Sequence, residues 1–501
     1  MKNYYITCLI LLLLGSCKPN ITSYEDIGID PPIIPDYAGV TIPKNIAPLN
    51  FYVDDYCQQI EVRFMLGDEE QFAFYGKHFT DLPLKRWQTL LQKAYEQKQP
   101  IRIEIAKEVK KKWLKYNPIQ IEVAEEIDPY IAYRLIEPGY VGWHLMGLYQ
   151  RNLTNFEESP IMENTLTLKN CMNCHAFANY SPDRFSFHMR GDMAGTVLAK
   201  EGKLTLLDTK TDVTSSTFTY PAWHPSGKFI AYSTNKTEQF FHALKEKQIE
   251  VYDEFSDIIL YDVENNRVII DSILCSPAKF ETYPSWSPDG RTLYFCSTDS
   301  TTMPDNFQDI QYTICSISFD PATMQFGDKI DTVYNPGGSN VFPRISPDGR
   351  FLLCTHLNYG CFPIWHKEAD LRMIDLQTKE EIPGEANSDD TESYHSWSSN
   401  GKWVMFTSRR NNGLFTRLYF SYVSPDGKMH KAFLLPQKTF DINAPRLKSY
   451  NVPEFISGKV TVSPYTIEKC ARSTPVKVQA DGTPSKPAAP QSYTITPGGR
   501  Y

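Results

Sequence analysis

The chain has 501 residues, of which 41% are hydrophobic, 22% charged and 13% aromatic. This length suffices for two or three domains with a large buried core, and the composition excludes a disordered protein. The 11 cysteines are too sparse for a small disulfide-stapled scaffold. The formal net charge of −8 leaves no basic surplus, so we expect no nucleic-acid partner.

The first 17 residues have the pattern of a processed targeting segment. Lys2 supplies the positive start, and the apolar run over 6–14 is too short to cross a bilayer as a helix. The segment ends in Leu14-Gly-Ser-Cys17, which resembles a bacterial lipobox. The resemblance implies that Cys17 is acylated and begins the mature protein. An ordinary signal peptide with a chance cysteine is the alternative.

Residues 18–48 are polar and rich in proline, which is typical of a tether between a lipid and a folded domain. We therefore expect the protein to be attached to a membrane of the bacterial cell envelope through its lipid. Resemblance to sorted lipoproteins implies an outer-membrane anchor facing the periplasm, because Lys18 is not an aspartate and no acidic cluster directly follows Cys17. Display on the cell surface is the alternative orientation.

Residues 49–140 are predicted to form a small α+β domain. Alternating apolar residues over 60–65 and 100–105 indicate strands, and the apolar spacing over 84–97 indicates an amphipathic helix. Five lysines between 107 and 115 are typical of a solvated helix face, with a docking patch for an acidic partner as the alternative.

The second half of the chain repeats itself. Four copies of a turn, each with a glycine before an apolar strand, place their glycines at 227, 290, 349 and 401. Three copies also carry a tryptophan four residues before the glycine, at Trp223, Trp286 and Trp397, where an indole ring can pack between neighbouring sheets. A period of 50–60 residues that holds four short strands is typical of a propeller blade.

These repeats resemble those of TolB-type β-propellers over residues 186–455. The predicted fold is therefore mainly β: a TolB-like β-propeller of five or six blades, in which 185–208 form a degenerate blade, preceded by the small α+β domain. Low-complexity residues 474–501 are predicted to be a disordered tail.

The motif Cys171-Met-Asn-Cys174-His175 predicts covalent attachment of one haem c within a segment over 141–185. Two thiols at this spacing can add to the haem vinyl groups, and the adjacent imidazole can bind the iron as proximal metal ligand. From the composition, about 0.005 occurrences are expected by chance. A Cys171–Cys174 disulfide with an incidental histidine is the alternative. A zinc site lacks a second clustered pair of ligands, and a thioredoxin-like motif lacks the surrounding βαβ pattern.

The sixth iron ligand is left open between several residues. His188 is the first candidate and Met189 and Met193 are alternatives, since period-2 alternation places His188 on the strand face opposite Met189. More distant candidates are His144, His224 and His242, or the position has no ligand. Arg190 could contact a haem propionate, with a solvent-facing charge as the alternative.

No motif of a hydrolase, a metalloprotease or a P-loop NTPase occurs, and a paired-haem peroxidase would need two attachment motifs. We therefore expect no enzyme. The combined features resemble TolB-like β-propeller lipoproteins that carry a c-type cytochrome motif. This implies electron transfer, with the propeller as a docking platform for an envelope or redox partner. The alternative is a propeller scaffold or binding protein with a structural or sensory haem, or with a CxxC disulfide and no haem.

Overall fold

The structure is a computed structural model that describes residues 21–138, 144–211, 213–214, 216–241, 249–439 and 447–481. The chain divides into two compact units. Among the described residues, the first unit holds 21–40, 48–123 and 437–439, and the second holds the rest.

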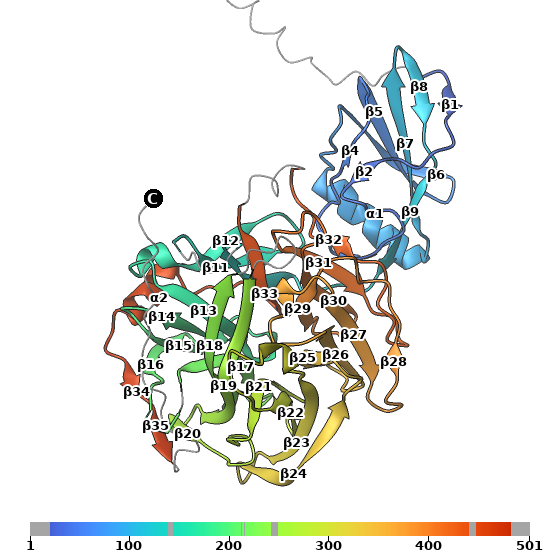
Figure 1. The fold of residues 1–501 in the computed structure, drawn as a ribbon. Coiled ribbons are helices and arrows are strands. Elements are labelled where there is room, and N and C mark those ends of the chain that lie inside the picture. Colours follow the sequence, from blue (N-terminus) through green and yellow to red (C-terminus); the bar gives the residue numbers. More distant parts are fainter. Residues whose placement is uncertain are drawn as a thin grey trace, which may run out of the picture. The chain divides into compact units, whose positions relative to one another are not determined.

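The first unit is an α+β fold (Figure 1). Its main sheet has the order β1-β8-β7-β5-β6, with β9 also paired to β7, and a second ladder joins β2 and β4. The helix α1 (Leu84–Gln97) confirms the helix predicted over these residues and buries Trp87, Leu90, Leu91 and Ala94 on one face. The strands are β1 (Tyr24–Asp26), β2 (Ile33–Ile34), β4 (Tyr52–Val53), β5 (Gln59–Leu66), β6 (Glu69–Gly76), β7 (Ile101–Val109), β8 (Lys112–Lys115) and β9 (Ile119–Ala124).

The segment predicted as a tether over 18–48 is folded in its described part, so that prediction is wrong there. Strand β1 pairs in parallel with β8, with Tyr24 opposite Trp113. Tyr37 and Val40 are 1% and 0% exposed. The prolines suggested an extended linker, but the apolar side chains between them bury enough surface to hold the segment on the domain.

The lysine cluster also differs from its prediction, because it lies in the β7–β8 hairpin rather than on a helix. Lys107 forms an ion pair with Asp55, and Lys115 with Glu104 at 3.2 Å. Alternating strand residues bring these lysines beside carboxylates of neighbouring segments, so part of the cluster is neutralised within the domain.

The second unit is a six-bladed β-propeller, which confirms the predicted fold class. Blade 1 combines β10, β11 and β12 with the late strand β33, and blades 2 to 6 each take four consecutive strands. Blades 1 to 3 are built by β10 (Tyr130–Ile136), β11 (Gly147–Asn152), β12 (Glu158–Glu163) and β33 (Ser449–Ile456); β13 (Cys171–Phe177), β14 (Arg184–Arg190), β15 (Gly195–Lys200) and β16 (Lys203–Asp208); and β17 (Phe218–Trp223), β18 (Phe229–Phe241), β19 (Ile249–Asp262) and β20 (Arg267–Ile269). Blades 4 to 6 are built by β21 (Lys279–Trp286), β22 (Thr292–Asp299), β23 (Thr313–Asp320) and β24 (Gln325–Tyr334); β25 (Ser339–Ile345), β26 (Phe351–Leu357), β27 (Asp370–Asp375) and β28 (Glu381–Ile382); and β29 (Glu392–Trp397), β30 (Trp403–Ser408), β31 (Arg417–Tyr422) and β32 (Phe433–Leu434).

The propeller is larger than the predicted range of 186–455. Its first described blade strand begins at Tyr130, and β33 closes the ring by pairing antiparallel to β10, with Tyr130 opposite Ile456. Figure 1 shows this late strand in the sheet of the early strands β11 and β12. Consequently the described part of 141–185 is not a separate haem-attachment segment: it contributes the outer strands of blade 1 and the innermost strand of blade 2.

The innermost strand of every blade contains one irregular residue with a positive φ, between 46° and 55°. The six residues are Cys174, Tyr220, Tyr283, Phe342, Tyr394 and Val452. A shift in strand register accompanies each of them. Cys174-His175 therefore occupies the place that Tyr220-Pro221 and Tyr283-Pro284 hold in the following blades. The CxxCH motif lies within a variant of the propeller repeat.

The repeat tryptophans join neighbouring blades, as predicted. The indole N–H groups of Trp223, Trp286 and Trp397 donate to the carbonyl oxygens of Ala176, Ala222 and Arg344 at 3.2, 3.1 and 3.2 Å. Each acceptor lies two residues after the positive-φ residue of another blade, so the same bond recurs around the ring.

The C-terminal part of the chain is ordered farther than predicted. After α2 (Pro464–Ala471), strand β34 (Val476–Lys477) pairs in parallel with β16, and β35 (Gln479–Asp481) with β20. Val478 between them is 2% exposed and packs in the core between blades 2 and 3. Residues 476–481 are therefore not a disordered tail, because an apolar side chain and two strand edges fix them; the tail beyond 481 lies outside the described residues.

The remaining elements are short. Strand β3 (Thr41–Pro43) belongs to the second unit, and four 3₁₀ turns are η1 (Asn164–Leu166), η2 (Ala178–Tyr180), η3 (Phe307–Asp309) and η4 (Pro363–Trp365). In the part of the chain that the structure describes, neither α-helix has the length and apolar character needed to cross a membrane.

Candidate functional site

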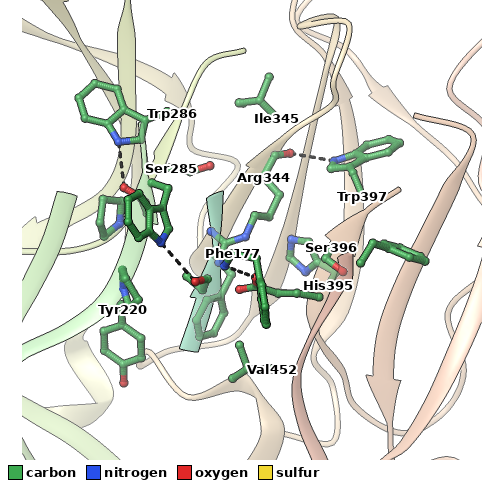
Figure 2. A pocket seen from close by; sticks show the side chains of 18 of the residues that line it. Phe177, Tyr220, Ser285, Trp286, Arg344, Ile345, His395, Ser396, Trp397 and Val452 are labelled. Carbon is green, nitrogen blue, oxygen red and sulfur yellow. Dashed lines mark hydrogen bonds between the residues drawn. The ribbon is translucent and has the colours of Figure 1, made fainter. Parts of the chain in front are cut away.

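A cavity of about 540 Å³ opens where the innermost strands of the six blades end (Figure 2). Equivalent residues of all six blades line it. The second residue after each positive-φ residue contributes to the wall: Ala176, Ala222, Ser285, Arg344, Ser396 and Glu454. The next residue in each blade is large and apolar: Phe177, Trp223, Trp286, Ile345, Trp397 and Phe455. The cavity thus combines an aromatic wall with polar side chains from several blades.

One cation and one carboxyl group face the cavity from different blades. Glu454 Oε2 accepts a hydrogen bond from the backbone N–H of Phe177 at 2.9 Å. Burial raises the pKa of Glu454 to about 7, although this hydrogen bond and the charge of Arg344 both lower it. Burial likewise lowers the pKa of the Arg344 guanidinium from its ordinary value, and the charge of Glu454 raises it.

His175 lines the same cavity and is 4% exposed. Burial lowers the pKa of its imidazole to about 3; the nearby Arg134 lowers it further, and a hydrogen bond with the Val452 backbone opposes the shift. The ring is therefore neutral at physiological pH. Its Nε2 is buried and has no hydrogen-bond partner among the described residues.

The two cysteines of the motif do not lie on the same wall. Cys174 lines the cavity and is 7% exposed, and burial raises the pKa of its thiol. Cys171 instead packs against the core cluster between blades 1 and 2. Both thiols are unpaired. The motif lies on β13, whose register shifts at the positive-φ residue Cys174, so this thiol reaches the cavity while Cys171, before the irregularity, stays at the core.

The predicted sixth ligands are not brought to this cavity. His188 is buried in β14, where its Nδ1 lies 3.0 Å from the hydroxyl of Thr196. Met189 packs in the core between blades 1 and 2, and Met193 lies in the turn between β14 and β15. Because side chains alternate along a strand, His188 faces away from the side that holds Met189. Arg190 is exposed at the end of β14, opposite Cys171.

The other histidine candidates are engaged elsewhere or lie outside the described part. His144 is exposed, with the Lys169 amine 3.3 Å from its ring. His224 packs between blades, with Nε2 2.9 Å from the Gly290 carbonyl oxygen. His242 and the predicted lipidation site Cys17 lie outside the described residues.

Sequence reasoning missed Arg344, Glu454 and Ser396. A signal for Arg344 was present, because the repeats place alanine or serine at its position in Ala222, Ser285 and Ser396. Glu454 had no such signal, since blade 1 lacks the turn that marks the other repeats. Its role depends on the closing strand β33.

No protein-family model matches the chain, and no curated protein matches it. Among solved structures, it is similar to TolB from Acinetobacter baumannii, with 14% identity over 71% of this chain and 79% of that one, at a TM-score of 0.41. It is also similar to the tricorn protease, with 14% identity over 67% of this chain and 33% of that one, at 0.36. A puromycin-hydrolysing peptidase of Mycobacterium tuberculosis shares 11% identity over 68% of this chain and 50% of that one, at 0.34. At these identities the likeness concerns the fold alone.

Proposed function

We propose that this is a non-enzymatic binding protein of the bacterial cell envelope that takes an organic ligand into the cavity of its propeller. The observation that carries the proposal is the cavity itself, about 540 Å³ in volume and lined by equivalent residues of all six blades. Sites for small ligands commonly measure about 300–1,000 Å³ and combine apolar walls with a few placed polar groups. The shifted pKa values of His175 and Glu454 are also typical of functional sites.

Binding is proposed in place of hydrolysis by Ser396 because no base is placed beside its hydroxyl. That hydroxyl has no hydrogen-bond partner among the described residues. The neighbouring imidazole of His395 is engaged elsewhere, with Nε2 3.1 Å from the Leu353 carbonyl oxygen and Nδ1 3.4 Å from the Thr355 hydroxyl. A serine nucleophile would need a base within hydrogen-bond reach.

The envelope location is proposed from the lipobox-like ending at Cys17. It implies attachment through lipid to the outer membrane, facing the periplasm, where the propeller would also offer its surface to an envelope protein.

Filling the cavity tests this function. Protein purified from its native envelope is expected to carry a co-purifying small molecule, detected by native mass spectrometry. Ala222→Phe should lose that molecule, because Ala222 lines the cavity. The matched control, Ala194→Phe, adds the same ring at an exposed turn and should retain it. Equal occupancy in both variants would show that the molecule binds outside the cavity.

A covalent haem c is a second candidate, favoured by the unpartnered Nε2 of His175 beside Cys174. A neutral imidazole whose other nitrogen is oriented by backbone is the arrangement of a metal ligand. His175 would hold the iron and Cys174 would form a thioether, but Cys171 would have to leave the core cluster to form the second. When bound, the haem would supply a reversible one-electron couple for electron transfer.

Expression together with haem-maturation machinery tests the second candidate. A haem that survives acid–acetone extraction and absorbs as a c-type cytochrome would support it. Cys174→Ala should abolish covalent attachment, whereas Cys171→Ala should retain one thioether because Cys171 is not on the cavity wall. A colourless protein with a Cys171–Cys174 disulfide would reject the haem and leave the binding function standing.

A further inference from the structure

Arg344, and Glu454 in blade 1, interrupt a ring of otherwise small side chains. At the position of Arg344, three of the other blades carry Ala176, Ala222 and Ser285, and blade 6 carries Ser396. Figure 2 shows the Arg344 side chain extending from β25 into the pocket toward Phe177. Among the described residues that line the cavity, Arg344 is the only one that is permanently cationic. Removing a charged side chain from water costs free energy, and an alanine at this place would avoid that cost. A ligand of opposite charge could offset it.

Most N–H groups of the Arg344 guanidinium have no acceptor among the described residues. Its Nη1 donates to the Pro343 carbonyl oxygen at 3.0 Å. A guanidinium offers five N–H donors in a fixed fork. The carboxyl group of Glu454 interacts with it electrostatically, but no carboxylate of the described residues lies within the 4.0 Å of an ion pair. Because burial also favours the neutral form of Glu454, the positive charge is only partly compensated near neutral pH.

Two further residues of the cavity wall carry a buried polar atom. The Nε2 of His175 and the hydroxyl of Ser396 have no hydrogen-bond partner among the described residues. A ligand that displaces these side chains slightly could supply the missing hydrogen-bond partners. They are a second observation, separate from the arginine, of polar groups left without a protein partner at this wall.

Resting on the proposed binding function, we infer that the cavity selects ligands that carry a carboxylate, with Arg344 as the residue that anchors it. Arginine binds carboxylates through two parallel hydrogen bonds, and this geometry adds specificity to the charge. The carboxylate can come from a small molecule or a peptide, or from the propionates of a haem. If the ligand is a haem, Arg344 makes the propionate contact that the sequence suggested for Arg190.

The test compares 2-naphthoate with 2-naphthamide, which share one aromatic framework and differ in charge. Isothermal titration of the full chain is expected to show about tenfold tighter binding of the naphthoate. In Arg344→Gln the two affinities should become equal, with binding of the naphthamide retained. The control Arg350→Gln, in which the lost side chain pairs with Asp375 at 3.0 Å, should leave the preference unchanged.

Glu454→Gln is a second variant, needed in case Arg344→Gln fails to fold. It should raise the affinity for the naphthoate, whereas Arg344→Gln should lower it. The glutamine oxygen can still accept from the Phe177 N–H, while the negative charge beside Arg344 is removed. At pH 8 this variant should bind the naphthoate severalfold more tightly than the native protein does. If the naphthamide binds but the naphthoate is not preferred, only the carboxylate inference is overturned. If neither compound binds, both the carboxylate inference and the proposed cavity-binding function are overturned.

A second pair of probes distinguishes the source of the carboxylate. Hemin and its dimethyl ester differ only in the free propionates, and their binding can be followed in the Soret band. A preference for hemin that disappears in Arg344→Gln identifies haem as the carrier. Equal binding of both, alongside a preference for the naphthoate, assigns the site to carboxylates of other ligands and excludes the propionate role.

Discussion

Glu454 holds a carboxyl group in the wall of a cavity, where desolvation penalises its charged form. Its pKa is raised from 4.5 to about 7 in the native state. Between these values the folded protein binds more protons than the unfolded chain, so the stability from protonated Glu454 is complete below pH 4.5 and is lost as the pH rises through 7. Relative to Glu454→Gln, the native protein should therefore lose on the order of 3 kcal/mol between pH 4 and pH 8.

Urea denaturation of both proteins across this pH range measures the difference directly. The comparison isolates Glu454, because the other titratable groups are common to the two chains. Buried His175, His188 and His395 have pKa values lowered to about 3, so they destabilise both proteins equally as the pH falls below 6.5. A difference in unfolding free energy that does not change with pH would contradict the buried carboxyl group.

Among the elements, the strap formed by β34 and β35 spans blades 2 and 3. The N–H groups of Val478 and Gln479 donate to the carbonyl oxygens of Asp208 and Asn266, both at 3.0 Å. Deleting 476–501 should lower the free energy of unfolding by about 2–4 kcal/mol, from the exposure of Val478 and the loss of these bonds. Deleting only 482–501 keeps the strap and serves as the control. Chemical denaturation should separate the two truncations, and equal stabilities would mean that the strap contributes nothing.

For the whole propeller, closure of the ring depends on β33. Tyr450 in this strand is 1% exposed, and its ring packs edge-on against Tyr133 of β10 at 4.9 Å between centroids. Tyr450→Ala should cost about 3–5 kcal/mol by leaving a cavity at the closure. Because each blade is held by its neighbours, we expect one cooperative transition, in which tryptophan fluorescence and circular dichroism shift together. Separate midpoints for the two signals would show that the blades do not unfold together, provided that they persist when Trp87 and Trp113 of the first unit are replaced by phenylalanine.

Much of the fold could be predicted because its determinants are local. The turns before Gly227, Gly290, Gly349 and Gly401 need particular residues at adjacent positions, so the repeat is visible in the chain itself. The helix α1 was predicted to the residue for the same reason, since its apolar spacing is continuous. The folded segment before residue 49 was missed, because its buried residues are scattered among prolines and acquire their partners only from distant strands.

The sequence by itself determined the propeller repeat, the lipobox-like ending and the chemical identity of Cys171, Cys174 and His175. The tertiary structure decided which of these side chains share a site. A one-residue irregularity in β13 turns Cys174 and His175 toward the cavity and leaves Cys171 in the core, while ring closure brings Glu454 beside residues nearly 300 positions earlier. Strand register and closure depend on pairings across the whole chain, and no local pattern records them.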